Sequence, residues 1–587
     1  MTRTSLRPSN GAQESPEIAP PPAPAAGCGD LAILERLLDD VLREQAGDQF
    51  PAELAALRGG EGHDLAGAVA SLDDRMAGRV ARACGMELAM ANVADELRRV
   101  RLRRAPEIVA DEPGDLSQTP LDVRLVLTAH PTGMARRSVL SKHRAVVACL
   151  ERLDDPSLQW TERARLEDEI SEALSIWYQT NEVRPMRPRV ADEVRRLLFF
   201  FESVLFDAAA DLMADRRRGS SEPGPASLSL RFGSWAGADM DGNPHVTEST
   251  ILEALQAHRA TALRLLVERL TPLRRDFSQA SSSLRLSDAL RESLTVDERE
   301  LPDTAAELAA RYPHEAREPL RRKLAFMVAR LRNTLELASG RASSGPGYGG
   351  PSELEADLCA IRDSVGSRAV GRGRLERLIW QTRIFGFHLA TLEVRENAPE
   401  LHAACAALLP GYGAARSETE RVALLTDACL RLPLPARLGD PIPKAAAALD
   451  CVAGAIALYG PDSVDTFIVS NAERASDLLC ALWLARRSGL FRPPLGPPSR
   501  ATGSSALELV PLFERGAALE RGTETMGQLY GNAAYSRHLR ARGDRQEVML
   551  GYSDAGKELG YLAGQWALYG AQERLARQAA ARGVRLR

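Results

Sequence analysis

Several kinds of feature are missing from this chain of 587 residues. No window holds the roughly 18 consecutive apolar residues that a membrane-spanning helix needs, and the N-terminus has no apolar stretch of the secretory type. The eight cysteines form no CxxC pair, which argues against a zinc knuckle or a redox motif. The 75 basic and 79 acidic residues leave a net charge of −4, without the basic excess of a nucleic-acid-binding protein. The sequence therefore predicts a cytoplasmic protein that binds neither membranes nor nucleic acid.

Lysine is the scarcest charged residue, with four copies against 71 arginines. The simplest explanation is a GC-rich genome that encodes most cations as arginine. Arginine cannot supply a compact ammonium group or release a proton near neutral pH, so each remaining lysine is a candidate for a specific role. The four are Lys142, Lys323, Lys444 and Lys557.

Composition divides the chain into three parts. Residues 1–29 are rich in Pro and Ala and predict a disordered leader that can be deleted without lowering the stability of the rest. Residues 30–110 show apolar positions at three- and four-residue spacing and predict an N-terminal helical segment. Residues 111–587 combine further helical stretches with short apolar runs, and they hold the polar motifs described next.

The short apolar runs predict a parallel sheet. None of them alternates cleanly between apolar and polar residues, and long helical stretches separate them, which is typical of buried parallel strands joined by helices. The six runs cover residues 123–130, 229–237, 385–397, 465–473, 507–514 and 547–554. Polar or ionisable residues end nearly every run, and the active site of a β/α barrel lies at that end of its strands. We therefore expect a predominantly helical protein whose helices surround an α/β barrel.

Candidate site residues follow the first three runs. His130 is followed by Arg136, Arg137 and Lys142, a cationic neighbourhood in which a histidine can move a proton near neutral pH, although a structural histidine is the alternative. Asp241 and Asn243 belong to a glycine-containing loop, GSWAGADMDGNPHVT (233–247), that either cradles an anion or forms a simple turn.

Arg395 lies at the end of a strand that we expect to be buried, so its guanidinium needs an anionic partner. Glu393 or Glu396 would be a structural partner, and a substrate carboxylate or phosphate a functional one.

The last two runs end in single carboxylates, Glu514 and Asp554. Two carboxylates facing one barrel mouth favour a hard divalent cation, whereas one alone is commonly a helix cap. Lys557 follows three residues after Asp554 and is either a point charge for a substrate oxyanion or a surface lysine. These residue types predict a metal-assisted enzyme that acts on small anions, without naming the substrate.

Taken together, the motifs resemble those of phosphoenolpyruvate carboxylases. The resemblance extends from about residue 30 to residue 587, and the motifs that carry it are VLTAHPTGMARRSVLSKH (126–143), RPMRPRVADEV (184–194), the 233–247 loop, FGFHLATLEVREN (385–397), VPLFE (510–514) and QEVMLGYSDAGKELG (546–560). It implies a TIM-like barrel of eight strands, six of them in this chain, and a homotetramer for the full-length family.

The resemblance also implies an activity, the carboxylation of phosphoenolpyruvate by bicarbonate to oxaloacetate and phosphate with Mg²⁺ or Mn²⁺, which replenishes the tricarboxylic acid cycle. Phosphate moves first to bicarbonate, giving carboxyphosphate and enolpyruvate, and carbon dioxide then adds to the enolate. Matching positions make His130 and Lys557 catalytic, Glu514 and Asp554 metal ligands, and Arg395, Arg136, Arg137, Asp241 and Asn243 substrate-binding.

The chain departs from the family pattern at several positions. Met240 stands where the family loop has arginine, Ala238 replaces a glycine, and Ala555 and Glu558 replace a serine and an aspartate. The sequence ends at GVRLR (583–587), before the family's HGRGG motif. We therefore expect little carboxylase activity from this chain alone. The alternatives are a non-catalytic remnant or scaffold of the family and a different reaction of phosphoenolpyruvate or pyruvate.

Overall fold

The computed structural model describes residues 28–58, 65–104, 121–128, 136–181, 189–218, 228–366, 373–431, 442–494 and 503–587. The chain divides into two compact units, one of residues 1–114 and 135–185 and one of residues 115–134 and 186–587. Nearly all of the predicted leader, and His130, lie outside the described residues. Among the described helices, none has both the length and the apolar character needed to cross a bilayer.

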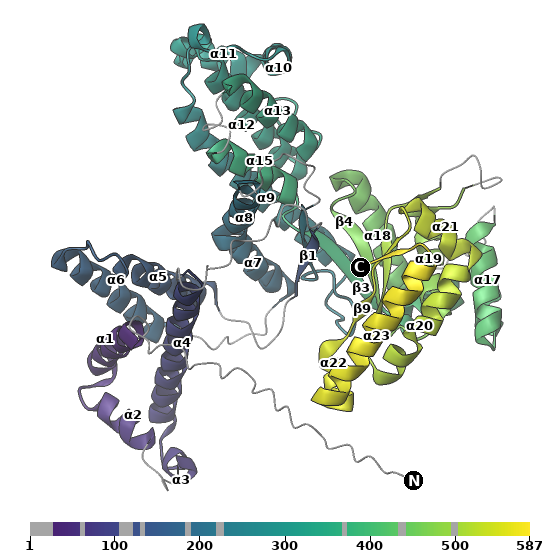
Figure 1. Cartoon of the computed structure of the whole chain (residues 1–587), viewed down its shortest axis with the longest axis horizontal. Coiled ribbons are helices and arrows are strands. Elements are labelled where there is room, and N and C mark those ends of the chain that lie inside the picture. Colours follow the sequence, from purple (N-terminus) through teal and green to yellow (C-terminus); the bar gives the residue numbers. More distant parts are fainter. Residues whose placement is uncertain are drawn as a thin grey trace, which may run out of the picture. The chain divides into compact units, whose positions relative to one another are not determined.

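The first unit is built from helices, drawn in purple and blue in Figure 1. Fully buried side chains such as Leu34, Val93 and Ile170 form its core, as the helical periodicity of this region predicts. Arg101 pairs with the buried Asp30 and, at 2.8 Å, with the more exposed Asp154. The helices are α1 (Cys28–Ala46), α2 (Phe50–Arg58), α3 (Leu65–Ala70), α4 (Asp74–Arg104), α5 (Arg137–Leu153) and α6 (Trp160–Gln179).

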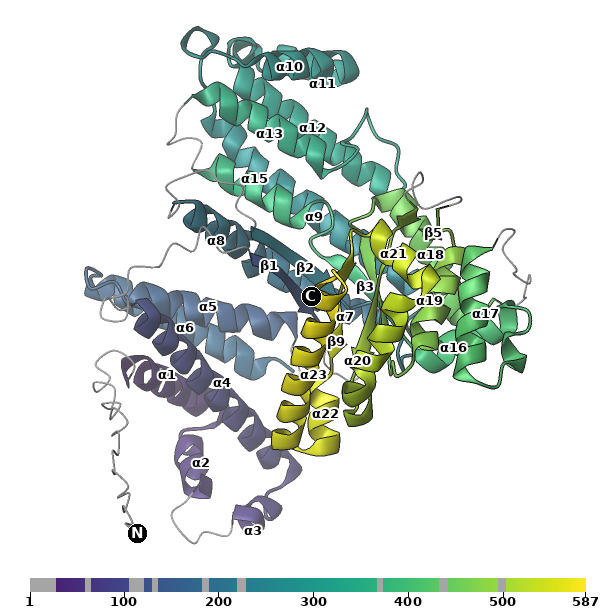
Figure 2. The same ribbon diagram turned by 45° about the vertical axis from the view of Figure 1, so that its right-hand side comes forward.

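A six-stranded parallel sheet organises the second unit. Its strands lie in the order β1-β2-β3-β4-β7-β9, and each of the six predicted runs overlaps one of them. Figure 2 shows the sheet curling like half of a barrel with helices packed along it. The strands are β1 (Leu121–Leu127), β2 (Leu228–Ser234), β3 (Thr391–Asn397), β4 (Val464–Ser470), β7 (Glu508–Phe513) and β9 (Met549–Leu550). Because every pair in the sheet is parallel, the carboxyl ends of all six strands share one edge.

Two short strand pairs accompany this sheet. β5 (Phe491–Arg492) and β6 (Ser504–Ser505) are antiparallel, and β8 (Arg545–Gln546) and β10 (Arg585–Leu586) are parallel. The helices of the second unit are α7 (Val190–Phe200), α8 (Phe206–Arg218), α9 (Glu248–Asp276), α10 (Asp288–Glu300), α11 (Pro302–Arg311), α12 (Pro319–Ala338), α13 (Pro351–Val365), α15 (Arg374–Phe385), α16 (Ala398–Leu408), α17 (Glu418–Leu430), α18 (Lys444–Tyr459), α19 (Ala475–Arg487), α20 (Gly516–Gly531), α21 (Ala533–Ala541), α22 (Tyr552–Leu559) and α23 (Tyr561–Ala581). A π-helical turn, Phe201–Leu205, joins α7 to α8.

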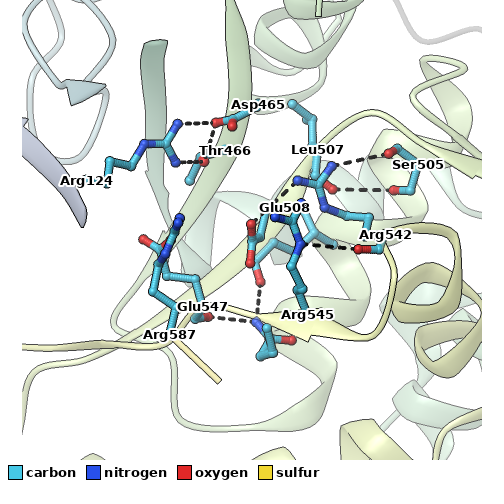
Figure 3. Close-up of polar contacts among 12 residues, drawn as sticks. Arg124, Asp465, Thr466, Ser505, Leu507, Glu508, Arg542, Arg545, Glu547 and Arg587 are labelled. Carbon is cyan, nitrogen blue, oxygen red and sulfur yellow. Dashed lines mark hydrogen bonds and ion pairs between the residues drawn. The ribbon is translucent and has the colours of Figure 1, made fainter. Parts of the chain in front are cut away.

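A buried arginine on β1 holds the curled sheet together. The side chain of Arg124 is 3% exposed, and its guanidinium lies 2.5 Å from Asp465 on β4 and 3.3 Å from Glu393 on β3. It also donates a hydrogen bond of 2.9 Å to the hydroxyl of Thr466 (Figure 3). Since β2 and β3 lie between β1 and β4 in the sheet, this side chain spans the concave face.

A second arginine connects the two edges of the sheet. Arg587 pairs with Asp122 on β1. It also lies 3.3 Å from Glu547, just before β9, and Figure 3 shows these two side chains together. β1 and β9 are the two edge strands. One guanidinium therefore bridges segments that are far apart in the sequence.

Helices α10, α12 and α13 share a buried ion cluster. Lys323 is fully buried, and its ammonium nitrogen lies 2.7 Å from the carboxylates of both Asp297 and Asp357. Arg330 approaches the other oxygen of Asp297 at 2.7 Å. This lysine, one of only four, neutralises charge between helices.

Replacing Lys323 with methionine should destabilise the second unit by about 3–5 kcal/mol, because the carboxylate of Asp357 loses the Lys323 ammonium group and that of buried Asp297 keeps only Arg330. The measurement is the free energy of unfolding of purified protein in urea. Arg577→Met is the matched control, since Arg577 forms an exposed pair with Glu573 at 2.8 Å and should leave the transition unchanged. Equal transitions for the two variants would show that the Lys323 cluster contributes no stability.

Candidate functional site

A polar hollow lies at the carboxyl edge of β7 and β9. Its volume is about 590 Å³, and it is lined by Asn471, Glu514, Arg515, Asp554, Lys557 and Glu558. Glu514 directly follows β7, whereas Asp554 and Lys557 lie on α22, which begins two residues after β9. A hydrogen bond of 2.9 Å from the amide of Gly551 to the carbonyl of Phe513 joins these two strand ends. Three of the predicted site residues thus share one hollow.

The neighbouring carboxyl group of Asp554 affects the ionisation of Glu514. Burial raises the pKa of Glu514 and the neighbouring Asp554 carboxyl group adds to the rise, while the amide of Asn471 and the charge of Arg395 oppose it. The amide of Asn471 donates a hydrogen bond of 2.7 Å to Glu514 Oε1. A cation bound between the two carboxyl groups would favour the ionised form of Glu514.

Lys557 forms an ion pair with Asp554 on the exposed side of the hollow. Its ammonium group is 3.2 Å from Asp554 Oδ1, and the two side chains are 76% and 48% exposed. An exposed ion pair of this kind contributes little to stability, so an anionic ligand can compete for the ammonium group. The geometry agrees with a point charge at the rim of the hollow.

Arg395 has a different partner from those considered from the sequence. Its guanidinium makes two bonds of 2.7 Å to the carboxylate of Asp239, and its Nη1 lies 3.6 Å from Asp241. It also stacks over the ring of Trp235, with its central carbon 4.7 Å from the ring centroid. Glu393 and Glu396, the structural partners expected on the same strand, are not its ion-pair partners. Glu393 instead lies 3.3 Å from Arg124 and accepts a hydrogen bond of 2.8 Å from Trp235 Nε1, and Glu396, adjacent to Arg395 in the strand, points to the opposite face.

The loop after β2 is attached to β3 by its backbone. Arg395 donates its amide to the carbonyl of Ala238 at 3.1 Å, and Met240 donates its amide to the carbonyl of Arg395 at 2.9 Å. The side chain of Met240, at the position of the family arginine, is buried in the apolar core. Met240 therefore adds packing where an arginine would have added a charge.

Asp241 and Asn243, which are predicted to bind substrate, make hydrogen bonds within and next to this loop. Asp241 accepts a hydrogen bond of 3.3 Å from the side chain of Asn397, and the Asn243 side chain accepts one of 3.0 Å from the amide of His245. Gly242 between them has φ of 65°, a left-handed conformation that glycine adopts without strain.

Lys444 and Glu396 are neighbours of the loop that the sequence analysis did not assign to the site. The Lys444 ammonium group lies 3.3 Å from the carbonyl of Asn243 and 3.5 Å from that of Met240. Glu396 is 1% exposed, and burial raises its pKa to about 7, against the opposing charge of Lys444. The rarity of lysine was the available signal for Lys444, whereas the deep burial of Glu396 depends on the tertiary fold.

The remaining predicted residues lie elsewhere or are not described. His130 is outside the described residues. Arg136 precedes α5, and Arg137 is its first residue, in the first unit. Within the described part of the chain, no group of three or more His, Cys, Asp or Glu side chains is arranged to hold a metal.

The stability of the fold should fall as the pH rises through about 7, because Glu396 must then ionise in a buried position. Its folded pKa of about 7 exceeds the ordinary value of 4.5, so its contribution is fully present below about pH 4.5 and is lost as the pH passes 7. Between about pH 5 and pH 8, the urea midpoint of the natural chain should fall more than that of Glu396→Gln. Exposed Glu520→Gln is the control, and equal slopes for all three proteins would contradict the assignment.

Comparison with known protein sequences identifies the family of this chain. The sequence model of the family described as phosphoenolpyruvate carboxylase matches residues 108–587. The phosphoenolpyruvate carboxylase of Xanthomonas oryzae pv. oryzae is 34% identical over 609 residues, covering 95% of this chain and 64% of that protein. Those of Roseiflexus castenholzii, at 34% identity, and Chromobacterium violaceum, at 32%, are covered to 64% and 65%.

The chain therefore spans slightly less than two thirds of the length of these relatives, while almost all of the chain itself is matched. The family model covers both the half-barrel sheet and the polar hollow at its carboxyl edge. On this evidence, the chain is a member of the phosphoenolpyruvate carboxylase family.

Proposed function

We propose that this chain carries the metal-binding and phosphoenolpyruvate-binding part of a phosphoenolpyruvate carboxylase site. The activity is the carboxylation of phosphoenolpyruvate by bicarbonate, giving oxaloacetate and phosphate. The observation that carries the proposal is the hollow shared by Glu514, Asp554 and Lys557, which combines two carboxylates for a cation with an ammonium group for an anion.

The donor set suits Mg²⁺ or Mn²⁺. Glu514 and Asp554 supply hard oxygen ligands, and Mg²⁺ is commonly held by one or two carboxylates with water and substrate oxygens completing its shell. The raised pKa of Glu514 is expected for a carboxylate that lies next to another carboxyl group with no cation between them. When bound, such an ion supplies positive charge that polarises the enol and phosphoryl oxygens.

The protein side chains then have separate tasks. Lys557 holds a substrate oxyanion by charge, and its exposed position allows it to leave Asp554 for the ligand. Arg395 binds substrate through its Nη1 group, since its Nε and Nη2 groups are held by Asp239. Asp241, Asn243, Arg136 and Arg137 are proposed as further substrate-binding residues.

His130 takes the remaining role. By family resemblance, we propose that it assists the breakdown of carboxyphosphate after the phosphoryl group has moved to bicarbonate. Carbon dioxide then adds to the enolate carbon, and phosphate leaves.

The finer fold assignment belongs to the same proposal. The curled sheet supplies six strands of an eight-stranded TIM-like barrel, with β1 and β9 as its edge strands. A cytoplasmic location and the homotetramer of the full-length family are predictions that accompany it.

A second candidate is a non-catalytic binding protein of the same family. The exposure of Asp554 and Lys557 favours it, because electrostatic stabilisation of a transition state requires a site that excludes water. Such a protein would bind the metal and the substrate without turning them over.

Mn²⁺ binding should depend on both carboxylates. Glu514→Gln and Asp554→Asn should each weaken Mn²⁺ binding, measured by electron paramagnetic resonance, by at least about tenfold. Exposed Glu520→Gln should bind Mn²⁺ as the natural chain does. Binding that is unchanged in both site variants would remove these residues from the metal site.

Oxaloacetate formation separates the two candidate functions. Purified 1–587 should turn over at least about 100-fold more slowly than the same chain extended by the unmatched third of a relative, because losing even one charge-stabilising donor typically costs that much. The measurement is a bicarbonate-dependent assay coupled to malate dehydrogenase. Comparable turnover by the two proteins would show that 1–587 holds the complete site, and no turnover by either would favour the binding protein.

A further inference from the structure

Lys444 attaches helix α18 to the loop that follows β2. Its ammonium nitrogen lies 3.3 Å from the carbonyl oxygen of Asn243 and 3.5 Å from that of Met240. Each of these carbonyls also closes a turn of the loop. The carbonyl of Met240 accepts the amide of Asn243, and the carbonyl of Asn243 accepts the amide of Val246, both at 3.3 Å. One ammonium group thus joins two consecutive turns.

A second contact shows that the same side of α18 faces this segment. Cys451 lies seven residues after Lys444, which is about two turns of a helix, so the two side chains share a face. The thiol of Cys451 donates a hydrogen bond of 3.6 Å to the carbonyl of Glu248, the first residue of α9. This face of α18 therefore contacts both the loop after β2 and the helix that follows the loop.

The stability of α18 by itself does not explain a cation at position 444. Lys444 is the first residue of the helix, and the first turn of α18 holds no acidic residue. The helix dipole disfavours a positive charge at this end of a helix. The basic residues of the chain are nearly all arginine, which cannot offer a compact ammonium group. The contacts with the two loop carbonyls account for a lysine here.

The positive charge of Lys444 also acts on a buried carboxyl group. Glu396 on β3 is 1% exposed, and its Oε1 accepts the amide of Asn397 at 2.9 Å. Among the described residues, Glu396 Oε2 has no hydrogen-bond partner. Burial raises the pKa of Glu396, the charge of Lys444 opposes this rise, and Glu400 and Asp241 add to it. An uncharged side chain at position 444 would remove this compensation.

The loop that Lys444 contacts carries the partners of Arg395. Asp239 accepts two hydrogen bonds of 2.7 Å from the guanidinium, and Asp241 lies 3.6 Å from its Nη1 group. Met240, between these two aspartates, donates its amide to the carbonyl of Arg395 at 2.9 Å. A shift of the loop at Met240 therefore moves both carboxylates and changes the direction of the guanidinium.

We propose that Lys444 is a positioning residue, which fixes the loop after β2 through two backbone carbonyls and thereby orients Arg395 toward the substrate. The attachment of the loop follows from the contacts alone, whereas the effect on substrate binding rests on the proposed function. The described residues that line the hollow of Glu514 and Asp554 do not include Lys444, so metal binding is independent of it.

Hydrogen–deuterium exchange of purified 1–587 tests the attachment of the loop. Lys444→Met removes the charge and the donors but keeps an unbranched side chain. The amides of residues 238–246 should exchange at least about tenfold faster in this variant, because hydrogen bonds from a charged donor are lost. The amide of Phe467, in the buried strand β4, should exchange at its natural rate and thus report an intact fold. Equal exchange of the loop in the variant and the natural chain would overturn the proposal.

Two further variants separate the charge of Lys444 from the packing of its side chain. Lys444→Arg keeps a cation with several N–H donors, so the loop should exchange within about threefold of its natural rate. Arg577→Met is the control, because Arg577 forms an exposed pair with Glu573 and should leave the loop unchanged. A loop that exchanges as fast in Lys444→Arg as in Lys444→Met would also overturn the proposal.

Calorimetric titration with phosphoenolpyruvate in saturating Mn²⁺ tests the effect on Arg395. Lys444→Met should weaken phosphoenolpyruvate binding by at least about fivefold, and Lys444→Arg should restore most of the affinity, because the guanidinium is again held in position. Mn²⁺ binding, measured by electron paramagnetic resonance, should be the same in both variants as in the natural chain. Natural affinity for phosphoenolpyruvate in Lys444→Met would contradict the positioning role, and so would an equal loss of Mn²⁺ affinity.

The two measurements allow this proposal and the proposed function to fail separately. If the natural chain bound no phosphoenolpyruvate, the proposed function would be wrong, and the exchange rates would still decide whether Lys444 holds the loop. If the natural chain bound phosphoenolpyruvate and the loop exchanged equally in all variants, only the role of Lys444 would be wrong.

Discussion

Parallel hydrogen bonding among six strands is the constraint on which the rest of the second unit depends. Because β1, β2, β3, β4, β7 and β9 run in one direction, the residues that follow them meet at one edge of the sheet. Glu514 and Asp554 are 40 positions apart in the chain, yet adjacent strand ends bring both into one hollow. The common direction of the strands is therefore sufficient to bring these polar residues to one edge of the sheet.

Buried cations then hold this arrangement in place. Arg124 crosses the concave face of the sheet to Asp465 and Glu393, and Arg395 holds Asp239 of the loop after β2 through two hydrogen bonds. A guanidinium buried without partners would be very costly, so each arginine requires its carboxylates to be nearby. The main effect of these ion pairs is to fix which loops and strands lie next to each other, and their net contribution to the free energy of unfolding is smaller.

The site combines buried and exposed charges. Glu396, deep beside the loop after β2, has its pKa raised by burial to about 7, whereas Lys557 and Asp554 are in contact with solvent. Desolvation thus controls the ionisation of the buried side chains in the inner part of the site, whereas water screens the interactions between the exposed charges in the outer part. Along α22, the exposed Tyr552 and Leu559 lie on either side of these two charged residues.

The sequence by itself determined the six strands, their parallel character and the helical surroundings. Apolar runs and helical periodicity are local signals, and each run overlaps a strand of the sheet. Motifs also determined the family, and they placed Glu514, Asp554 and Lys557 at strand ends.

Only the tertiary structure decided which charges pair. In the folded chain, Arg395 pairs with Asp239 and not with Glu393 or Glu396. Lys444 lies against the carbonyls of the loop after β2, and the side chain of Met240 is buried in the core. Ion-pair partners, burial and the resulting pKa shifts depend on distances between segments far apart in the chain. No local pattern encodes those distances, because they arise when the strands pair and the sheet curls.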